Sequence, residues 1–189
     1  MMQDLSLHIL DLCENSLAAG ARLVTVAVEQ RPGEDRLTVS VRDDGRGMTA
    51  EQLRRVCDPF YTTRTTRPVG LGVPMFRLAA ELTGGSFSIS SQPGRGTEVR
   101  AEFVPSHIDC LPLGDMAATM CTLISGSPGV DFVYTRLYDD RRFELDTRRM
   151  RGILGAVPLN TPEVLDWVGG FVRENEAHAA GRGKGEQSL

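Results

Sequence analysis

The feature that most constrains this chain is a series of short polar segments that follow one another within its first hundred residues. Each segment contains acidic residues, amides or glycines and lies at the end of a stretch that has helix or strand periodicity. In order they are DLCEN at residues 11–15, DDGRG at 43–47, DPFYTTR at 58–64, GLG at 70–72 and GRGT at 94–97. Each segment alone is a weak signal, but the order and spacing together predict one ligand pocket.

The composition is that of a globular protein of one or two domains. The 189 residues are 41% hydrophobic and 24% charged, and the net charge of −4 argues against nucleic acid as the main partner. No apolar run approaches the roughly 20 residues of a membrane helix, and the first residues do not resemble a signal peptide. The four cysteines form no CxxC pair, so we expect reduced thiols and a cytoplasmic protein.

The first hundred residues alternate between helical and strand patterns. Their periodicity predicts a helix over 5–19, a hairpin of strands 23–29 and 37–41, a short helix opened by Thr49, a helix over 73–83, and a closing hairpin of strands 87–91 and 97–104. Asp11 and Asn15 are four residues apart and share one helix face. Helices and strands in this order predict an α+β fold, a two-layer sandwich.

The motif series resembles the N, G1, F and G2 boxes of the GHKL ATPase superfamily, which includes histidine kinases, type II topoisomerases, mismatch-repair clamps and one class of chaperone. The resemblance covers roughly residues 4–105. It implies the Bergerat ATP-binding fold, a mixed sheet covered by helices, with ATP and Mg²⁺ as cofactors. The nucleotide-binding residues that it implies are Asn15, Asp43, Gly45, Gly47, Met48, Phe60, Arg64, Gly70, Leu71, Gly72 and Thr97.

The implied adenine pocket centres on Asp43. A buried carboxylate needs a donor, and the amino group of adenine can be that donor. Gly45 and Gly47 allow the backbone to approach the base. Thr97 matches the family threonine that supports this carboxylate through a water, and Asn15 matches the asparagine that coordinates Mg²⁺.

The implied phosphate end lies in the second half of the series. Phe60 would pack near the pocket, and Arg64 would place a cation where the phosphates end. The GLG segment precedes a helix whose amino terminus can hold phosphate oxygens. The segment 62–69 would be the lid over ATP. Pro68 stands where the family pattern has the first of three glycines, and a proline there would stiffen the end of this lid.

Asp11 is the candidate catalytic residue, and two interpretations remain open for it. Some GHKL branches carry a carboxylate, usually Glu, at this position as general base, so Asp11 could activate a water or a hydroxyl. Alternatively Asp11 is a surface residue or the ion-pair partner of a lid arginine. For His8, one turn earlier, a core or supporting role is favoured over phospho-acceptance.

The predicted organisation is an ATPase domain over residues 1–105, a small α+β unit over 106–176 and a disordered tail over 177–189. In the second unit, Asp115 can cap a helix to about Ser125, a hairpin covers 130–146, and a helix begins near Pro162. This unit resembles no family and would pack on the first domain or contact a partner. His107, Asp109 and Cys110 match no standard zinc spacing.

The resemblance implies an ATP- and Mg²⁺-binding histidine-kinase-like module in bacterial signalling of the two-component type. The leading hypothesis is a stand-alone protein kinase, serine/threonine or histidine-kinase-like, or an ATPase. The alternative is a non-enzymatic, ATP-gated switch of protein interactions. Few residues precede the first helix, so we expect no phospho-acceptor domain. A protein partner or phospho-acceptor is expected, a homodimer is left open, and a clamp ATPase is disfavoured.

Overall fold

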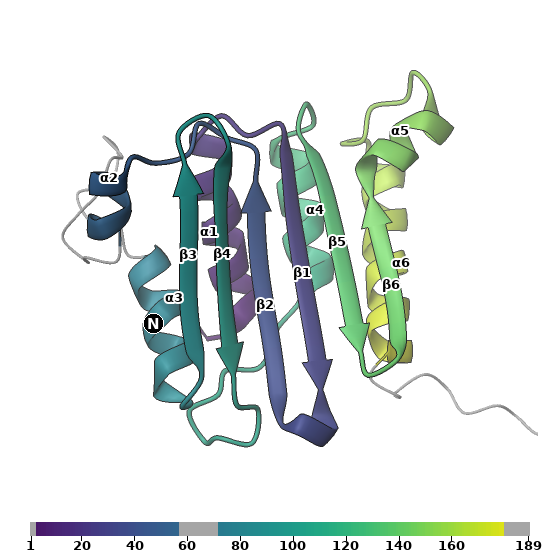
Figure 1. Cartoon of the computed structure of the whole chain (residues 1–189). Helices are drawn as coiled ribbons and strands as arrows, with labels where there is room; N and C mark the ends of the chain where they lie inside the picture. Colours follow the sequence, from purple (N-terminus) through teal and green to yellow (C-terminus); the bar gives the residue numbers. More distant parts are fainter. Residues whose placement is uncertain (1–2, 57–71, 180–189) are drawn as a thin grey trace, which may run out of the picture.

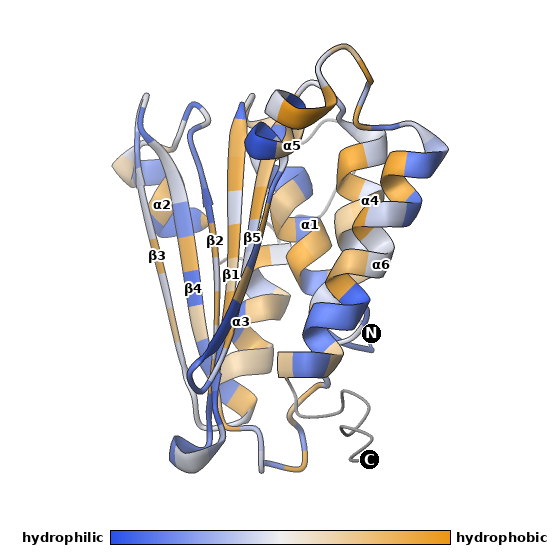
Figure 2. Cartoon of the chain, turned by 90° about the vertical axis from the view of Figure 1, so that its right-hand side faces the viewer, coloured by the Kyte–Doolittle hydropathy of each residue, from blue (hydrophilic) through white to orange (hydrophobic). Residues whose placement is uncertain are grey.

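The computed structural model describes residues 3–56 and 72–179, which form one mixed sheet with helices on one face (Figures 1 and 2). The strand order is β3-β4-β2-β1-β5-β6. The strands are β1 (Leu23–Arg31), β2 (Arg36–Asp43), β3 (Ser86–Gln92), β4 (Gly96–Phe103), β5 (Asp131–Tyr138) and β6 (Arg141–Asp146). The helices are α1 (Leu5–Ala18), the short 3-10 helix η1 (Pro32–Glu34), α2 (Ala50–Arg55), α3 (Gly72–Leu82), α4 (Met116–Gly126), α5 (Thr147–Leu154) and α6 (Pro162–Ala179).

The centre of the sheet is β1, which pairs antiparallel with β2 and parallel with β5. Val24, Val26 and Val28 are buried beneath the helices, whereas Thr25 and Ala27 between them lie half-buried on the other face. This alternation follows from the two-residue period of a strand. The fold is the predicted α+β sandwich, a mixed sheet covered by helices. No described helix has the length and apolarity that a membrane crossing needs.

The predicted helix starts are confirmed. The Asp4 carboxylate caps α1 by accepting a hydrogen bond from the Leu7 amide at 3.1 Å. At α2, Thr49 and Gln52 form a reciprocal capping box, with distances of 3.2 and 2.9 Å. Such caps satisfy amides that the first helical turn leaves without partners.

The residues after 105 extend the same sheet. The hairpin of β5 and β6 adds to the edge of β1, and α4 packs between α1 and α6. Helix α5 was not anticipated; the Asp146 side chain caps it by accepting from the Arg148 amide at 2.9 Å. Helix α6 continues to Ala179, past the start of the predicted tail at residue 177, and residues 180–189 lie outside the described part.

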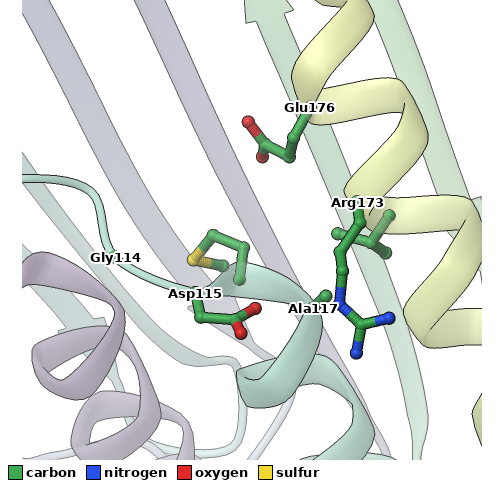
Figure 3. Close-up of a pocket in the computed structure, with 7 residues that line it drawn as sticks. Gly114, Asp115, Ala117, Arg173 and Glu176 are labelled. Carbon is green, nitrogen blue, oxygen red and sulfur yellow. The ribbon is translucent and has the colours of Figure 1, made fainter.

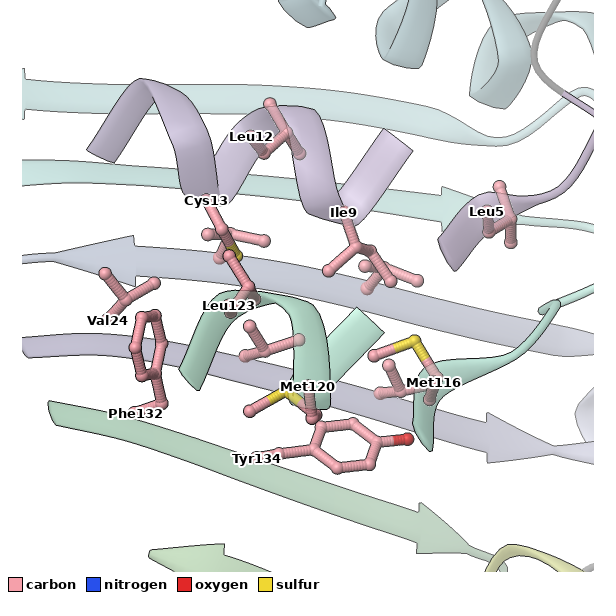
Figure 4. Packing of buried hydrophobic residues seen from close by; sticks show 14 of the residues in the cluster. Leu5, Ile9, Leu12, Cys13, Val24, Met116, Met120, Leu123, Phe132 and Tyr134 are labelled. Carbon is pink, nitrogen blue, oxygen red and sulfur yellow. The ribbon is translucent and has the colours of Figure 1, made fainter. Parts of the chain in front are cut away.

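The hydrophobic core is continuous between the two parts of the chain. Leu5, Ile9 and Val24 from the first part pack in one cluster with Met120 and Phe132 from the second (Figure 4). The backbone joins them too, because the Leu5 and Ser6 amides donate to the carbonyls of residues 112 and 113 at 2.9 and 2.8 Å. Helix α1, which carries the first motif, is therefore fixed by contacts from the carboxy-terminal unit.

A buried ionic network anchors α6 to the sheet. The Arg136 side chain on β5 is only 3% exposed and pairs with Glu176 of α6 at 3.1 Å. Glu176 also accepts from the Tyr134 hydroxyl, and Arg136 donates to the side chain of Gln30 on β1 at 2.7 Å. A buried charge needs such partners because desolvation is costly.

Candidate functional site

The candidate site is built around Asp43, the last residue of β2, whose side chain is buried behind α1. Its Oδ2 accepts from the Ser16 hydroxyl at 2.8 Å, and its Oδ1 accepts from the amides of Gly45 at 2.9 Å and Thr97 at 3.3 Å. A carboxylate offers about four acceptor positions. Three are taken by these described groups, so Oδ2 keeps one position for an N–H donor of a ligand.

Ser16 is a site residue that sequence reasoning missed. It follows Asn15 on α1, is 4% exposed, and its hydroxyl also lies 3.3 Å from the Leu12 carbonyl. Nothing in the local pattern separates this serine from an ordinary helical one. Its role depends on the packing of α1 over the end of β2, which brings together residues that are 27 apart in the sequence.

Two glycine loops, residues 43–47 and 94–97, pack against one another beside Asp43. Gly47 and Gly96 have positive φ angles of 64° and 89°. A Cβ at Gly47 would overlap the carbonyl of Gln92, and a Cβ at Gly96 would overlap the carbonyl of Asp43. The Gly94 amide also donates to the Arg46 carbonyl at 2.8 Å. The close contact made at Gly47 is thus with the end of strand β3.

Ser91 is a second residue that the sequence did not reveal. Its hydroxyl accepts a hydrogen bond from the Met48 amide at 2.8 Å and lies 2.9 Å from both the Gly96 carbonyl and the Thr97 hydroxyl. Thr97 therefore supports Asp43 directly, through its backbone amide, while its hydroxyl is held by Ser91. This arrangement ties the two glycine loops to one another at the end of the sheet.

Asp44, next to the central carboxylate, has a structural role. Its Oδ1 accepts from the amides of Arg22 and Leu23 at 2.7 and 2.9 Å, so it links the end of β2 to the start of β1. Burial opposes its ionisation, but the hydrogen bonds from Leu23, Arg22 and its own amide lower the pKa of Asp44.

Asp11 and Asn15 meet the start of α3. A Cβ added at Gly72 would overlap the Asp11 carboxylate and lie 3.3 Å from Asn15 Nδ2. Both side chains are half-buried on one face of α1, as their spacing predicted, whereas Glu14 is exposed. The tertiary fold therefore brings the first motif and the end of the GLG segment together.

The remaining predicted site residues, Phe60, Arg64, Gly70 and Leu71, lie outside the described residues. Their proposed roles stay predictions.

His8 and Cys13 form the buried support of this face of α1. The His8 ring is 4% exposed and lies 5.8 Å from the ring of Phe76 on α3, and its Nδ1 has no described hydrogen-bond partner. Burial lowers the pKa of His8, although the carboxylates of Asp11 and Asp4 oppose this shift. Burial, together with nearby Asp43 and Glu14, raises the pKa of Cys13, so its thiol stays protonated.

A separate hollow lies between α4 and α6 (Figure 3). Asp115 enters it from the start of α4, and Arg173 and Glu176 enter it from α6. The Glu176 carboxylate is engaged by Tyr134 and Arg136, so its role there is structural. Within residues 3–56 and 72–179, no group of three His, Cys, Asp or Glu side chains is placed to hold a metal, and His107 pairs with Asp109 at 3.7 Å.

Comparison with protein families gives a match over residues 3–107 to the model described as histidine kinase-, DNA gyrase B-, and HSP90-like ATPase. This stretch is more than half of the chain and contains every motif of the series. The chain belongs to this ATPase family. It is accordingly an ATP-binding, histidine-kinase-like module, as the resemblance of its motifs implied.

Individual relatives agree with the family. The chain is 39% identical over 90 residues to the sensor histidine kinase ZraS of Klebsiella oxytoca, which covers 47% of this chain and 19% of that protein. It is 35% identical over 75 residues to the sensor histidine kinase YxdK of Bacillus subtilis, covering 38% and 23%. The match thus spans about a fifth of these kinases.

A solved structure extends the likeness in fold. The crystal structure of the N-terminal domain of a DNA repair protein superposes with a TM-score of 0.54 at 11% identity, covering 82% of this chain and 58% of that one. At this identity the likeness concerns the fold alone.

Proposed function

We propose that this protein is an ATP- and Mg²⁺-dependent protein kinase or ATPase in bacterial signal transduction, with a partner protein as phospho-acceptor. The observation that carries the proposal is the environment of Asp43. Its carboxylate is fixed by Ser16, Gly45 and Thr97 and keeps one acceptor position, which suits the amino group of adenine. The sensor histidine kinases among the relatives support the assignment to signalling.

The described residues fit a bound nucleotide with Mg²⁺. The carboxamide oxygen of Asn15 is a ligand that a hard cation accepts, and Mg²⁺ takes few protein ligands because it borrows others from phosphates and water. The Asn15 side chain on α1 lies beside Gly72, the first residue of α3, where helix amides favour negative charge. When bound, the cation would neutralise charge on the phosphates.

Asp11 is the proposed general base of this site. Its carboxylate lies beside Gly72 on the same helix face as Asn15, so it is close to the expected phosphate end. There it could take the proton of a water or of a hydroxyl on the partner protein.

Nucleotide binding tests the shared premise. Titration calorimetry with ATP and MgCl₂ should show binding to the wild type. Asp43→Asn should weaken it roughly ten- to hundredfold, because a hydrogen bond to a charged group contributes about 1.5–3 kcal/mol. Asp140→Asn, in the exposed β5–β6 turn, is the control and should bind as wild type. Absence of binding to the wild type would refute the proposal.

Turnover tests the role of Asp11. If it is the base, Asp11→Asn should lower ATP hydrolysis or phosphotransfer by about 10²–10⁴-fold while ATP still binds. Glu14→Gln, on the exposed side of the same helix, should leave the rate unchanged. Equal rates for wild type and Asp11→Asn would exclude this role.

A non-enzymatic switch is the second candidate, and the contact between Asp11 and Gly72 favours it. A carboxylate against the first residue of α3 can stabilise that helix through its dipole. Asp11 would then hold the helix, and ATP would change a binding surface through differential contacts. Labelled ATP incubated with proteins of the source cell separates the candidates, since a kinase labels an acceptor and a switch labels none.

A further inference from the structure

The hollow between α4 and α6 is a second candidate binding site, separate from the site at Asp43 (Figure 3). It has a volume of about 290 Å³, close to the lower limit of about 300 Å³ for small-molecule sites. Met116, Ala117 and Val172 supply its apolar lining, and charged side chains reach it from both helices. A concave, mostly apolar surface with a few charged groups is the usual setting of a small ligand.

Two charges that line this hollow have no ion-pair partner among the described residues, Arg173 of α6 and Asp115 at the start of α4. They also do not pair with each other. Glu176, the third charged residue of the lining, is already paired with Arg136 at 3.1 Å. The hollow therefore keeps one positive and one negative group for a ligand.

The Arg173 side chain lies against both helices. A Cβ at Gly169, one turn earlier on α6, would lie 3.2 Å from Arg173 Nη2 and 3.4 Å from Cys121 Sγ on α4. Glycine is destabilising inside a helix, but here it leaves room for the guanidinium. Burial is the main cause that raises the pKa of Cys121; Arg173 opposes this shift, and Asp115, with Asp166 of α6, adds to it. Both charges of the hollow are therefore close to the same point on α4.

The Asp115 carboxylate keeps an oxygen for a ligand. Its Oδ1 accepts from the Ala118 amide at 2.9 Å and so caps α4, whereas its Oδ2 has no described donor. The wall beside it is fixed by the start of α1, because a Cβ at Gly114 would overlap the Asp4 carboxylate and the Ser6 hydroxyl. A wall held in this way is preformed, which lowers the ordering cost of binding.

We propose that this hollow binds a free α-amino acid with an aliphatic side chain. Arg173 donates to the carboxylate of the ligand, Asp115 accepts from its ammonium group, and the aliphatic side chain packs on the apolar lining. A simple anion would leave Asp115 without a partner, and a simple cation would leave Arg173 without one, so a ligand with both charges is selected. The site is independent of the nucleotide chemistry, so its test is made without ATP.

Titration calorimetry of the full chain with L-leucine, L-valine and L-methionine tests the site. At least one of them should bind saturably. The amide of that amino acid lacks the carboxylate, and its N-acetyl derivative lacks the ammonium group. Each derivative should bind roughly tenfold more weakly or worse, because each loses a hydrogen bond between charged groups. No saturable binding of any of the three, or equal binding of either derivative, would overturn the proposal.

Two substitutions locate the binding in the hollow. Asp115→Asn removes the charge but keeps the cap of α4, because asparagine caps a helix as well as aspartate does. This change and Arg173→Gln should each weaken binding roughly tenfold or more. Glu174→Gln, on the same helix but outside the lining, is the matched control and should bind as wild type. Circular dichroism melting checks that each variant is folded, and unchanged binding in either Asp115→Asn or Arg173→Gln would contradict the proposal.

Discussion

At the scale of single residues, the site depends on how precisely one carboxylate is held. Asp43 is buried, yet both of its oxygens have donors, two from backbone amides and one from the Ser16 hydroxyl. A backbone donor can be removed only by proline, which also changes the backbone, whereas alanine removes the hydroxyl alone. Ser16 is therefore the position at which the hold on Asp43 can be tested.

Ser16→Ala should weaken ATP binding by roughly ten- to hundredfold, because a hydrogen bond to a charged group contributes about 1.5–3 kcal/mol. Calorimetry measures the change, and Ser106→Ala, on an exposed loop away from the site, is the control. An unchanged dissociation constant would mean that the two amides suffice to hold Asp43.

His8 should make stability depend on pH. Its pKa is lowered from the ordinary 6.5, chiefly by burial, while Asp11 and Asp4 oppose the shift. The unfolded chain therefore takes up a proton before the folded chain does. The contribution of neutral His8 to the free energy of unfolding is complete above pH 6.5. It is lost as the pH falls toward the folded pKa, by at most about 1.4 kcal/mol per pH unit.

Urea unfolding between pH 8 and pH 5 measures this effect. His8→Leu should show a smaller loss of unfolding free energy on acidification than the wild type. The exposed His178, replaced by Asn, should leave the profile unchanged. Parallel profiles for His8→Leu and wild type would show that other groups cause the acid sensitivity.

At the scale of elements, the site depends on the contact between α1 and α3. Gly72 opens α3 against Asp11 and Asn15, and there is no room for a Cβ. A larger residue must push the two helices apart or displace the two side chains. The glycine is needed for this close approach.

Gly72→Ala should therefore weaken ATP binding at least tenfold and lower stability by roughly 1–3 kcal/mol through overpacking. Gly170→Ala in α6, where a Cβ meets nothing within 4 Å, is the matched control. It should stabilise the chain by up to about 1 kcal/mol, since alanine has the higher helix propensity. Calorimetry and thermal melting give the two readouts, and unchanged ATP binding in Gly72→Ala would show that the helices adapt.

At the scale of the whole molecule, the ATPase part and the carboxy-terminal unit share one sheet and one core. The family match ends near residue 107, but β5 covers the edge of β1, and α4 covers one side of α1. We propose that the two units fold together. The division at residue 105 would then describe the motifs and not the folding unit.

A chain that ends at Pro105 should lose cooperative unfolding, because α1 and β1 lose their apolar neighbours and α1 loses the backbone contacts of Leu5 and Ser6. A chain that ends at Ala179 is the control and should melt as wild type. Calorimetric melting and amide exchange measure both. A cooperative transition in the 105-residue chain would show that the first unit folds alone.

The elements themselves were predictable from the sequence because their signals are local. Period-two valines in β1 and the helix start at Thr49 depend on residues a few positions apart, and each is observed. Helix α5 was missed because its eight-residue sequence, TRRMRGIL, is short and has only three large apolar side chains to mark a buried face. Its clearest start signal is a capping aspartate directly after a strand.

By itself, the sequence determined the motifs, their order, the family and the shared helix face of Asp11 and Asn15, since these follow from residue types and helix period. Only the tertiary structure decided that Ser16 holds Asp43, that Gly72 meets Asp11, and that β5 continues the sheet beyond β1. These contacts join residues far apart along the chain. They arise from packing, in which one apolar face must cover another, and no local pattern records which partner that will be.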